Sequence, residues 1–148
     1  MQPRSHETTK KNKRSFSCLR VFVVAFVLMP QGRSTWDGVY SDAQARRGEA
    51  IYADRCATCH APDLSGMDQA PALAGADFFT EWNDLSINDL FERTRISMPA
   101  DKPGSLEPQQ VADVLAFVLQ KNGFPAGPAD LPSNADTLKT IAFVAKKP

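Results

Sequence analysis

Histidine and cysteine are scarce in this chain of 148 residues, and the shortage limits the metal chemistry that it can support. There are two histidines, His6 and His60, and three cysteines. A structural zinc site takes four Cys or His ligands, usually as two pairs. Only Cys56, Cys59 and His60 lie close together, and no second pair follows them in the sequence. The sequence therefore argues against a zinc protein.

Long hydrophobic runs are missing as well. The apolar run of residues 21–29 holds nine residues, whereas a helix needs about 20 to span a bilayer. Five basic side chains precede it within residues 10–20, and a basic segment followed by a short apolar run is typical of a secretory signal peptide. We therefore predict that residues 1–33 are a signal peptide and that the protein is exported, to the periplasm. The alternative is an uncleaved N-terminal anchor that leaves the protein facing the periplasm.

Neither sign of charge is in excess, because the chain has 17 basic and 17 acidic side chains. Removal of residues 1–34, which carry seven basic and one acidic side chain, would leave 10 basic and 16 acidic ones. Proteins that bind nucleic acids neutralise phosphates with a basic surface, so we expect no nucleic acid partner. A protein partner with a basic patch would suit this chain better.

One short motif carries most of the information about function. It is Cys56-Ala57-Thr58-Cys59-His60. Two thiols three positions apart lie on one side of a tight turn, where they can add to the two vinyl groups on one edge of a porphyrin. The next residue, His60, is then held under the iron, and this spacing is typical of c-type haem attachment. We predict one covalent haem c, with thioether bonds to both cysteines and with His60 as an iron ligand.

A redox-active Cys-x-x-Cys is the other interpretation of this motif. It would need strands alternating with helices around the motif, as in thioredoxin. The segments on both sides have helical patterns instead, and no strand is expected between them. The sequence therefore favours haem attachment over thiol redox chemistry.

The second axial ligand of the iron is less tightly specified. Without residues 1–33 the chain has a single histidine, His60, so two histidine ligands from one chain are excluded. Met98, Met67, a lysine, water or no ligand remain. Met98 is favoured because Pro99 fixes its backbone and because 38 residues separate it from His60, enough to wrap the other face of the porphyrin. A thioether ligand raises the reduction potential and saturates the iron, which suits the transfer of single electrons.

Capping residues and apolar periodicity predict three main helices, over residues 42–54, 87–97 and 108–121. The first contains Gly48, and glycine inside a helix costs up to about 1 kcal/mol relative to alanine. Such a glycine is explained if another element packs closely against it. We expect the helix of residues 108–121 to cross there, with Phe117 or Val114 in the notch.

Two further residues are expected to contact the haem or its ligand. A metal-bound imidazole usually donates its other ring N–H to a carbonyl, and the carbonyl of Pro71, in the long loop of residues 61–75, is the candidate acceptor from His60. Trp82 belongs to a group of three aromatic residues that would line a haem pocket. Its indole N–H needs a partner when buried, and a haem propionate is the expected one.

With these residues in place, the chain resembles the class I monohaem cytochromes c, in particular exported bacterial ones often associated with periplasmic dehydrogenases. The resemblance covers residues 36–125 and rests on five segments: residues 47–52 before the haem motif, 71–75, 90–99, 103–106 and 111–125. It implies an all-α cytochrome c fold, with helices packed around one covalent haem and the first and last helices crossing. It also implies His60 and Met98 as axial ligands.

The domain organisation and function follow from this resemblance as expectations. We predict a cytochrome c domain over residues 36–124 and a C-terminal extension over residues 125–148, partly ordered and held to the surface by Leu131, Leu138, Ile141 and Phe143. The protein is expected to be an electron carrier and not an enzyme, with a periplasmic dehydrogenase or respiratory protein as its redox partner. No small-molecule substrate is expected.

Two alternatives from other functional classes remain open. A haem enzyme or gas sensor would have an open sixth iron position, and carbon monoxide binding to the ferrous protein would favour it. A domain permanently docked to a dehydrogenase would use residues 124–148 as its anchor. Under that hypothesis, deletion of the anchor abolishes co-purification and leaves the haem spectrum intact.

Overall fold

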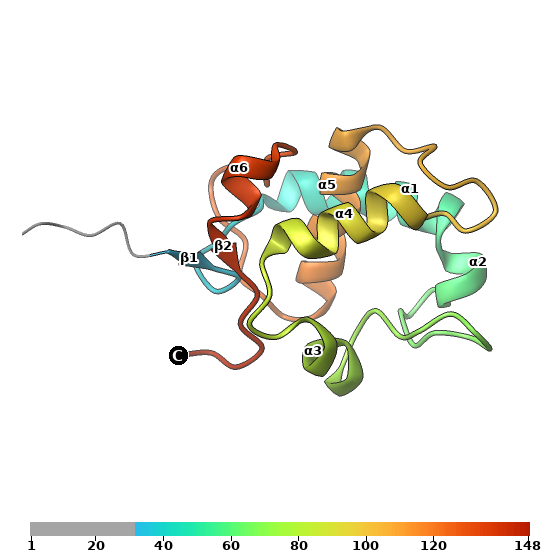
Figure 1. Ribbon diagram of the computed structural model, residues 1–148, viewed down its shortest axis with the longest axis horizontal. Coiled ribbons are helices and arrows are strands. Elements are labelled where there is room, and N and C mark those ends of the chain that lie inside the picture. Colours follow the sequence, from blue (N-terminus) through green and yellow to red (C-terminus); the bar gives the residue numbers. More distant parts are fainter. Residues whose placement is uncertain (1–31) are drawn as a thin grey trace, which may run out of the picture.

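A computed structural model describes residues 32–148, and this part of the chain is mostly helical (Figure 1). The all-α prediction is thus confirmed. The predicted signal peptide or anchor lies, apart from residues 32 and 33, outside the described residues. Within residues 32–148, no helix has the length and apolar character needed to cross a membrane. The helices are α1 (Asp42–Arg55), α2 (Ala57–His60), α3 (Ala76–Trp82), α4 (Ile87–Ser97), α5 (Pro108–Lys121) and α6 (Ala135–Leu138).

The long helices begin where the sequence supplies a cap. The Ser41 side chain accepts a hydrogen bond from the backbone N–H of Gln44 at the start of α1. Ser86 and Asp89 form a reciprocal capping box at the start of α4. These side chains satisfy N–H groups that the first turn of a helix leaves unpaired. The predicted bounds of α4 and α5 agree with the structure, and α1 is one residue longer than predicted.

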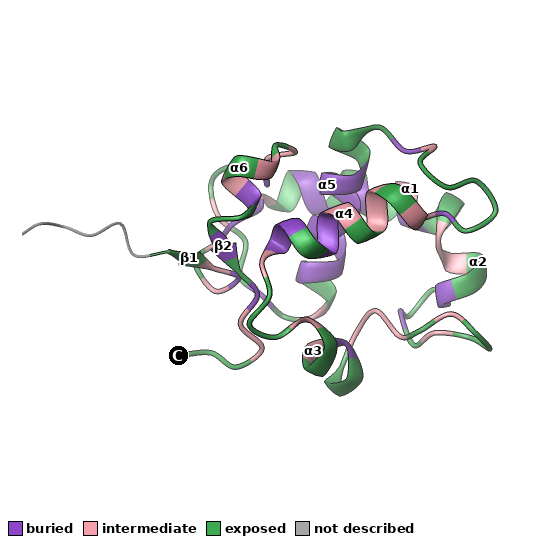
Figure 2. Ribbon diagram, in the orientation of Figure 1, coloured by how far each residue is buried: buried purple, intermediate pink, exposed green. Residues whose placement is uncertain are grey.

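Helices α1 and α5 cross at Gly48, as predicted. A Cβ atom built on Gly48 would overlap the carbonyl group of Asp113 in α5, so the two helix backbones touch at this point. The notch is therefore filled by the α5 backbone and not by the side chain of Phe117 or Val114. Phe117 packs instead against Tyr52 of α1, with ring centroids 5.1 Å apart. Figure 2 shows that α5 is buried over most of its length, so the crossing lies at the centre of the fold.

Replacement of Gly48 by alanine is expected to force α1 and α5 apart. The added methyl group would meet backbone atoms of Asp113, which cannot rotate away as a side chain could. Overpacking costs about 1–3 kcal/mol and occasionally more, so we expect the free energy of unfolding to fall by about 3 kcal/mol, despite the better helix propensity of alanine. Denaturant titration of the haem-loaded protein measures this loss. Glu49→Ala, at an exposed position on the same helix, is the control, and equal stability of the two variants would contradict the backbone contact.

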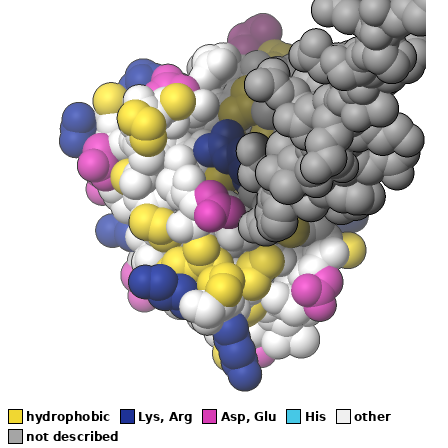
Figure 3. Space-filling view, turned by 90° about the vertical axis from the view of Figure 1, so that its left-hand side faces the viewer, with side chains coloured by type: hydrophobic (Ala, Val, Ile, Leu, Met, Phe, Trp, Pro, Cys, Tyr) yellow, Lys and Arg dark blue, Asp and Glu magenta, His cyan; other side chains and the backbone are white. Residues whose placement is uncertain are grey.

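Residues 125–148 are packed into the fold. Strand β2 (Ile141–Ala142) pairs in parallel with β1 (Arg33–Ser34). On its other side the chain bonds to the loop before α4: the N–H of Phe143 donates to the carbonyl of Leu85 (2.8 Å), and its carbonyl accepts from the N–H of Asp84 (2.9 Å). Figure 3 shows this end of the molecule, where apolar side chains gather on the lower part of the face with Lys and Arg side chains beside them.

The burial of this segment differs from the expected surface extension. Four large apolar side chains of the segment are almost fully buried and belong to the same core cluster as those of α5. They are Leu131, Leu138, Ile141 and Phe143. These same four side chains were expected to hold the extension to the surface, and the structure buries them in the core instead. The segment is therefore part of the core.

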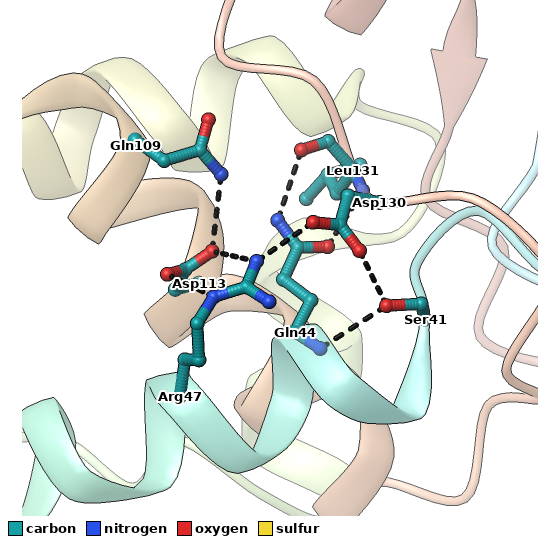
Figure 4. A network of polar contacts seen from close by, with 7 residues as sticks. All are labelled: Ser41, Gln44, Arg47, Gln109, Asp113, Asp130 and Leu131. Carbon is teal, nitrogen blue, oxygen red and sulfur yellow. Dashed lines mark hydrogen bonds and ion pairs between the residues drawn. The ribbon is translucent and has the colours of Figure 1, made fainter.

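A polar network fixes the start of this segment to the crossing of α1 and α5 (Figure 4). Arg47 of α1 donates to the two carboxylate oxygens of Asp113 at 3.0 and 3.1 Å and to Asp130 at 2.7 Å. The buried Gln44 bonds the backbone of Leu131 twice, donating to its carbonyl at 3.0 Å and accepting from its N–H at 2.6 Å. The C-terminal segment is thus attached by charge and by hydrogen bonds as well as by apolar burial.

Candidate functional site

The Cys-x-x-Cys-His motif lies where α1 ends and α2 begins. The N–H of Cys56 donates to the carbonyl of Tyr52 at 2.9 Å and closes the last turn of α1. The carbonyl of Cys56 then accepts from the N–H groups of Cys59 (3.1 Å) and His60 (2.9 Å). This single turn places both cysteines and His60 in the wall of one cavity.

His60 is buried, and its ring is oriented by the loop of residues 61–75. Its Nδ1 atom lies 2.8 Å from the carbonyl oxygen of Pro71, which is the contact that the sequence analysis expected. Because a carbonyl oxygen can only accept, the proton of a neutral ring belongs on Nδ1 and the lone pair on Nε2. This is the tautomer that a histidine needs in order to bind a metal through Nε2.

The cavity beside His60 has a volume of about 540 Å³, which lies within the range of roughly 300–1,000 Å³ found for cofactor and ligand sites. Its wall is built from the end of α1, from α2, α3, α4 and α5, and from the loops after α2 and α4. It is predominantly apolar, as a porphyrin requires. All six predicted site residues line it, namely Cys56, Cys59, His60, Pro71, Trp82 and Met98.

Both candidate methionine ligands line the cavity, in different surroundings. Met98 directly follows α4 in extended backbone and is partly buried, and Pro99 after it is buried. Met67 lies in the loop after α2, and half of its surface (50%) is exposed to solvent. Met98 is therefore the better shielded from solvent of the two.

The part of the wall that α3 provides is aromatic. Phe78 is buried, and its ring centroid lies 6.4 Å from that of Trp82. Arg55 and Arg93 are among the residues that line the same cavity. Carboxylates of a bound cofactor would therefore have cationic partners in addition to the Trp82 indole N–H that the sequence predicted.

Two polar side chains that hold the site were not predicted. The hydroxyl of Tyr52 donates to the carbonyl of Ala61 at 2.7 Å and fixes the chain just after His60. Burial raises the pKa of Tyr52 to about 12, so the hydroxyl keeps its proton at neutral pH.

Asn122 donates to the carbonyl of Leu73 at 2.9 Å and ties the loop of residues 61–75 to the end of α5. Its place before a glycine indicated only a helix end, so its second role had no signal in the sequence.

Cys56 lacks the acidity of a redox-active thiol. Burial raises the pKa of Cys56 to about 11, whereas the attacking thiols of redox Cys-x-x-Cys motifs have lowered pKa values. The elements on both sides of the motif, α1 and α3, are helices. Among residues 32–148, no group of three or more His, Cys, Asp and Glu side chains is arranged to hold a metal ion. The donor set of two thiols, one oriented imidazole and a thioether in an apolar cavity fits a haem.

The fold, the attachment motif and the cavity together define a c-type cytochrome. The chain belongs to the family of cytochrome c oxidase, cbb3-type, subunit III, whose model matches residues 43–118, just over half of the sequence. The sulfane dehydrogenase SoxCD from Paracoccus pantotrophus is a similar solved structure, with 22% identity and a TM-score of 0.48. That match covers 77% of this chain and 64% of the other, less than two thirds of its length. None of the curated proteins matches.

Family membership confirms the predictions at the level of the class. A class I cytochrome c has haem c with iron as its cofactor and serves in electron transfer, and both properties were predicted. The axial ligands, a single haem, export and the redox partner are finer statements and stay predictions.

Proposed function

We propose that this protein is a monohaem electron carrier whose iron is held between His60 and Met98. The observation that supports this most directly is the presence of an oriented imidazole and a partly buried methionine in the wall of one cavity. When bound, haem c supplies a one-electron couple between ferrous and ferric iron. The cysteines would hold the porphyrin by two thioether bonds, and the two axial ligands would leave no position for a substrate.

The remaining residues of the cavity prepare this site for outer-sphere electron transfer. Pro71 fixes the ring and the tautomer of His60. The apolar side chains of Phe78, Leu90 and Leu115 line the cavity and limit the access of water to it. A dry surrounding and a thioether ligand both favour the ferrous state, since burial and axial ligation are the main means by which a protein sets a haem potential. We therefore expect a potential higher than that of a bis-histidine haem.

The redox partner proposed from the charge of the chain is a protein with a basic surface. Residues 32–148 contain 11 basic and 16 acidic side chains, and haem propionates would add negative charge. Complementary charge raises the rate at which redox proteins find one another. A periplasmic dehydrogenase or a respiratory protein would fit, with residues 1–33 acting as the export signal.

An optical spectrum of the haem-loaded protein tests this proposal. We expect a low-spin ferrous spectrum, a weak near-infrared sulfur-to-iron band in the ferric protein and the mass of one covalent haem per chain. Carbon monoxide should not bind to the ferrous protein at neutral pH. Rapid binding of carbon monoxide, or a high-spin ferrous spectrum, would instead support the haem enzyme or gas sensor.

A further inference from the structure

Next to the haem cavity lies a cluster of six aromatic rings with neighbouring centroids 4.8–6.5 Å apart. Its members are Trp36, Phe78, Phe79, Trp82, Phe124 and Phe143. Two of them, Phe78 and Trp82, line the cavity. Phe143 comes from the C-terminal segment and is only 1% exposed. The cluster therefore links the last residues of the chain to the wall of the cofactor site.

Phe143 makes the closest ring contact with Phe78. The two centroids are 5.7 Å apart and the planes are inclined by 82°, so one ring presents its edge to the face of the other. This is a favoured arrangement, worth roughly 0.5–1.5 kcal/mol beyond the area that it buries. The other two rings near Phe78 belong to its own helix, at 6.4 Å (Trp82) and 6.5 Å (Phe79). Within the cluster, Phe143 is the ring that connects Phe78 to a different element.

The backbone of Phe143 is held on both sides, whereas α3 is short and weakly capped. Besides the two backbone bonds between Phe143 and residues 84–85, the neighbouring Val144 carbonyl accepts from the indole Nε1–H of Trp36 at 2.8 Å. Helix α3 has seven residues and no side-chain hydrogen bond at its N-cap. The fixed partner of the pair is thus Phe143, and Phe78 lies on the element that needs support.

We propose that Phe143 is a positioning residue for the haem, which holds Phe78 in the cavity wall and so restricts the access of water and external ligands to the iron. This rests on the proposed function, in which the iron carries a methionine ligand that an external ligand must displace. The C-terminal segment then affects the redox site through one aromatic contact. Without the aromatic ring at position 143, the side chain of Phe78 is free to turn. The cavity wall is then less tightly packed.

Imidazole binding to the ferric, haem-loaded full-length protein tests this proposal in an optical titration. Phe143→Leu keeps an apolar side chain but removes the edge-to-face contact. We expect its imidazole affinity to rise by up to about tenfold, since a tenfold change is about 1.4 kcal/mol and an edge-to-face pair contributes roughly 0.5–1.5 kcal/mol. Leu131→Ala is the matched control, since Leu131 is fully buried in the same segment and lies outside the ring cluster. Its affinity should stay near the wild-type value.

A double variant shows whether Phe143 acts through Phe78. If it does, Phe143→Leu should add nothing in a Phe78→Leu background, because contacting residues are not additive. Additive effects, or an equal rise in Leu131→Ala, would overturn the proposal. Should Phe143→Leu fail to fold, Phe143→Met serves as the second variant with the same expectation. The assignment of Met98 as axial ligand has its own test, because an unchanged near-infrared band in Met98→Ala would contradict it. The imidazole titration measures access to the iron and does not depend on which residue is the axial ligand.

Discussion

Met98→Ala is expected to lower the reduction potential by on the order of 0.1 V or more, within the roughly 0.8 V range over which axial ligands set haem potentials. Loss of the thioether removes the ligand that favours ferrous iron and leaves water or nothing in its place. The near-infrared band of the ferric protein should disappear, and the ferrous protein should bind carbon monoxide. Potentiometry and optical spectra of the haem-loaded variant measure all three changes.

Met67→Ala provides the matched control for this experiment. Met67 lines the same cavity, but half of its surface is exposed to solvent. We expect its potential, near-infrared band and carbon monoxide response to match those of the wild type. A loss of the band in Met67→Ala, with Met98→Ala unchanged, would move the ligand to Met67. Unchanged spectra in both variants would remove sulfur from the coordination sphere.

Truncation after residue 124 is expected to prevent the formation of a stable haem-loaded protein. It removes four almost fully buried side chains, Leu131, Leu138, Ile141 and Phe143. Burial of each contributes about 1.5–3 kcal/mol, so the sum is comparable with the whole stability of a typical domain, about 5–15 kcal/mol. The yield of haem-loaded protein and its denaturant midpoint measure the effect.

Truncation after residue 145 is the control, because it removes only Lys146, Lys147 and Pro148, which are exposed. We expect this variant to have wild-type stability. The two truncations distinguish a C-terminal segment that is part of the core from the hypothesis that residues 124–148 are a detachable anchor. That hypothesis expects an intact haem spectrum after the longer truncation, whereas the burial described above predicts its loss. An anchoring role would therefore have to be tested with exposed substitutions, not with deletions.

Local patterns in the sequence were sufficient for much of the site. The Cys-x-x-Cys-His spacing is a property of one turn, and capping residues such as Ser86 and Glu107 act within four residues of their own position. Gly48 also gave a correct prediction, because a glycine inside a helix has a cost that a close crossing explains. Each of these signals lies within a short stretch of chain, and each can be recognised before the fold is known.

Contacts between distant parts of the chain could not be predicted in this way. Phe143 pairs with Phe78, 65 residues earlier, and although its apolar neighbours indicate that the segment packs on the domain, they do not identify Phe78 as its partner. Asn122 holds the loop of residues 61–75 through a carbonyl at Leu73, although its neighbourhood indicates only a helix end. Such roles are set by what lies opposite in three dimensions, and one sequence does not contain that information in a local pattern.

The parallel pairing of Arg33–Ser34 with Ile141–Ala142 has a practical consequence for handling the protein. Both ends of the described chain leave the molecule at the same end, and α2 with the attachment motif lies at the other end (Figure 1). A linker added before residue 32 or after residue 148 should thus immobilise the described part of the protein on an electrode or bead, with its cofactor end directed toward the solution.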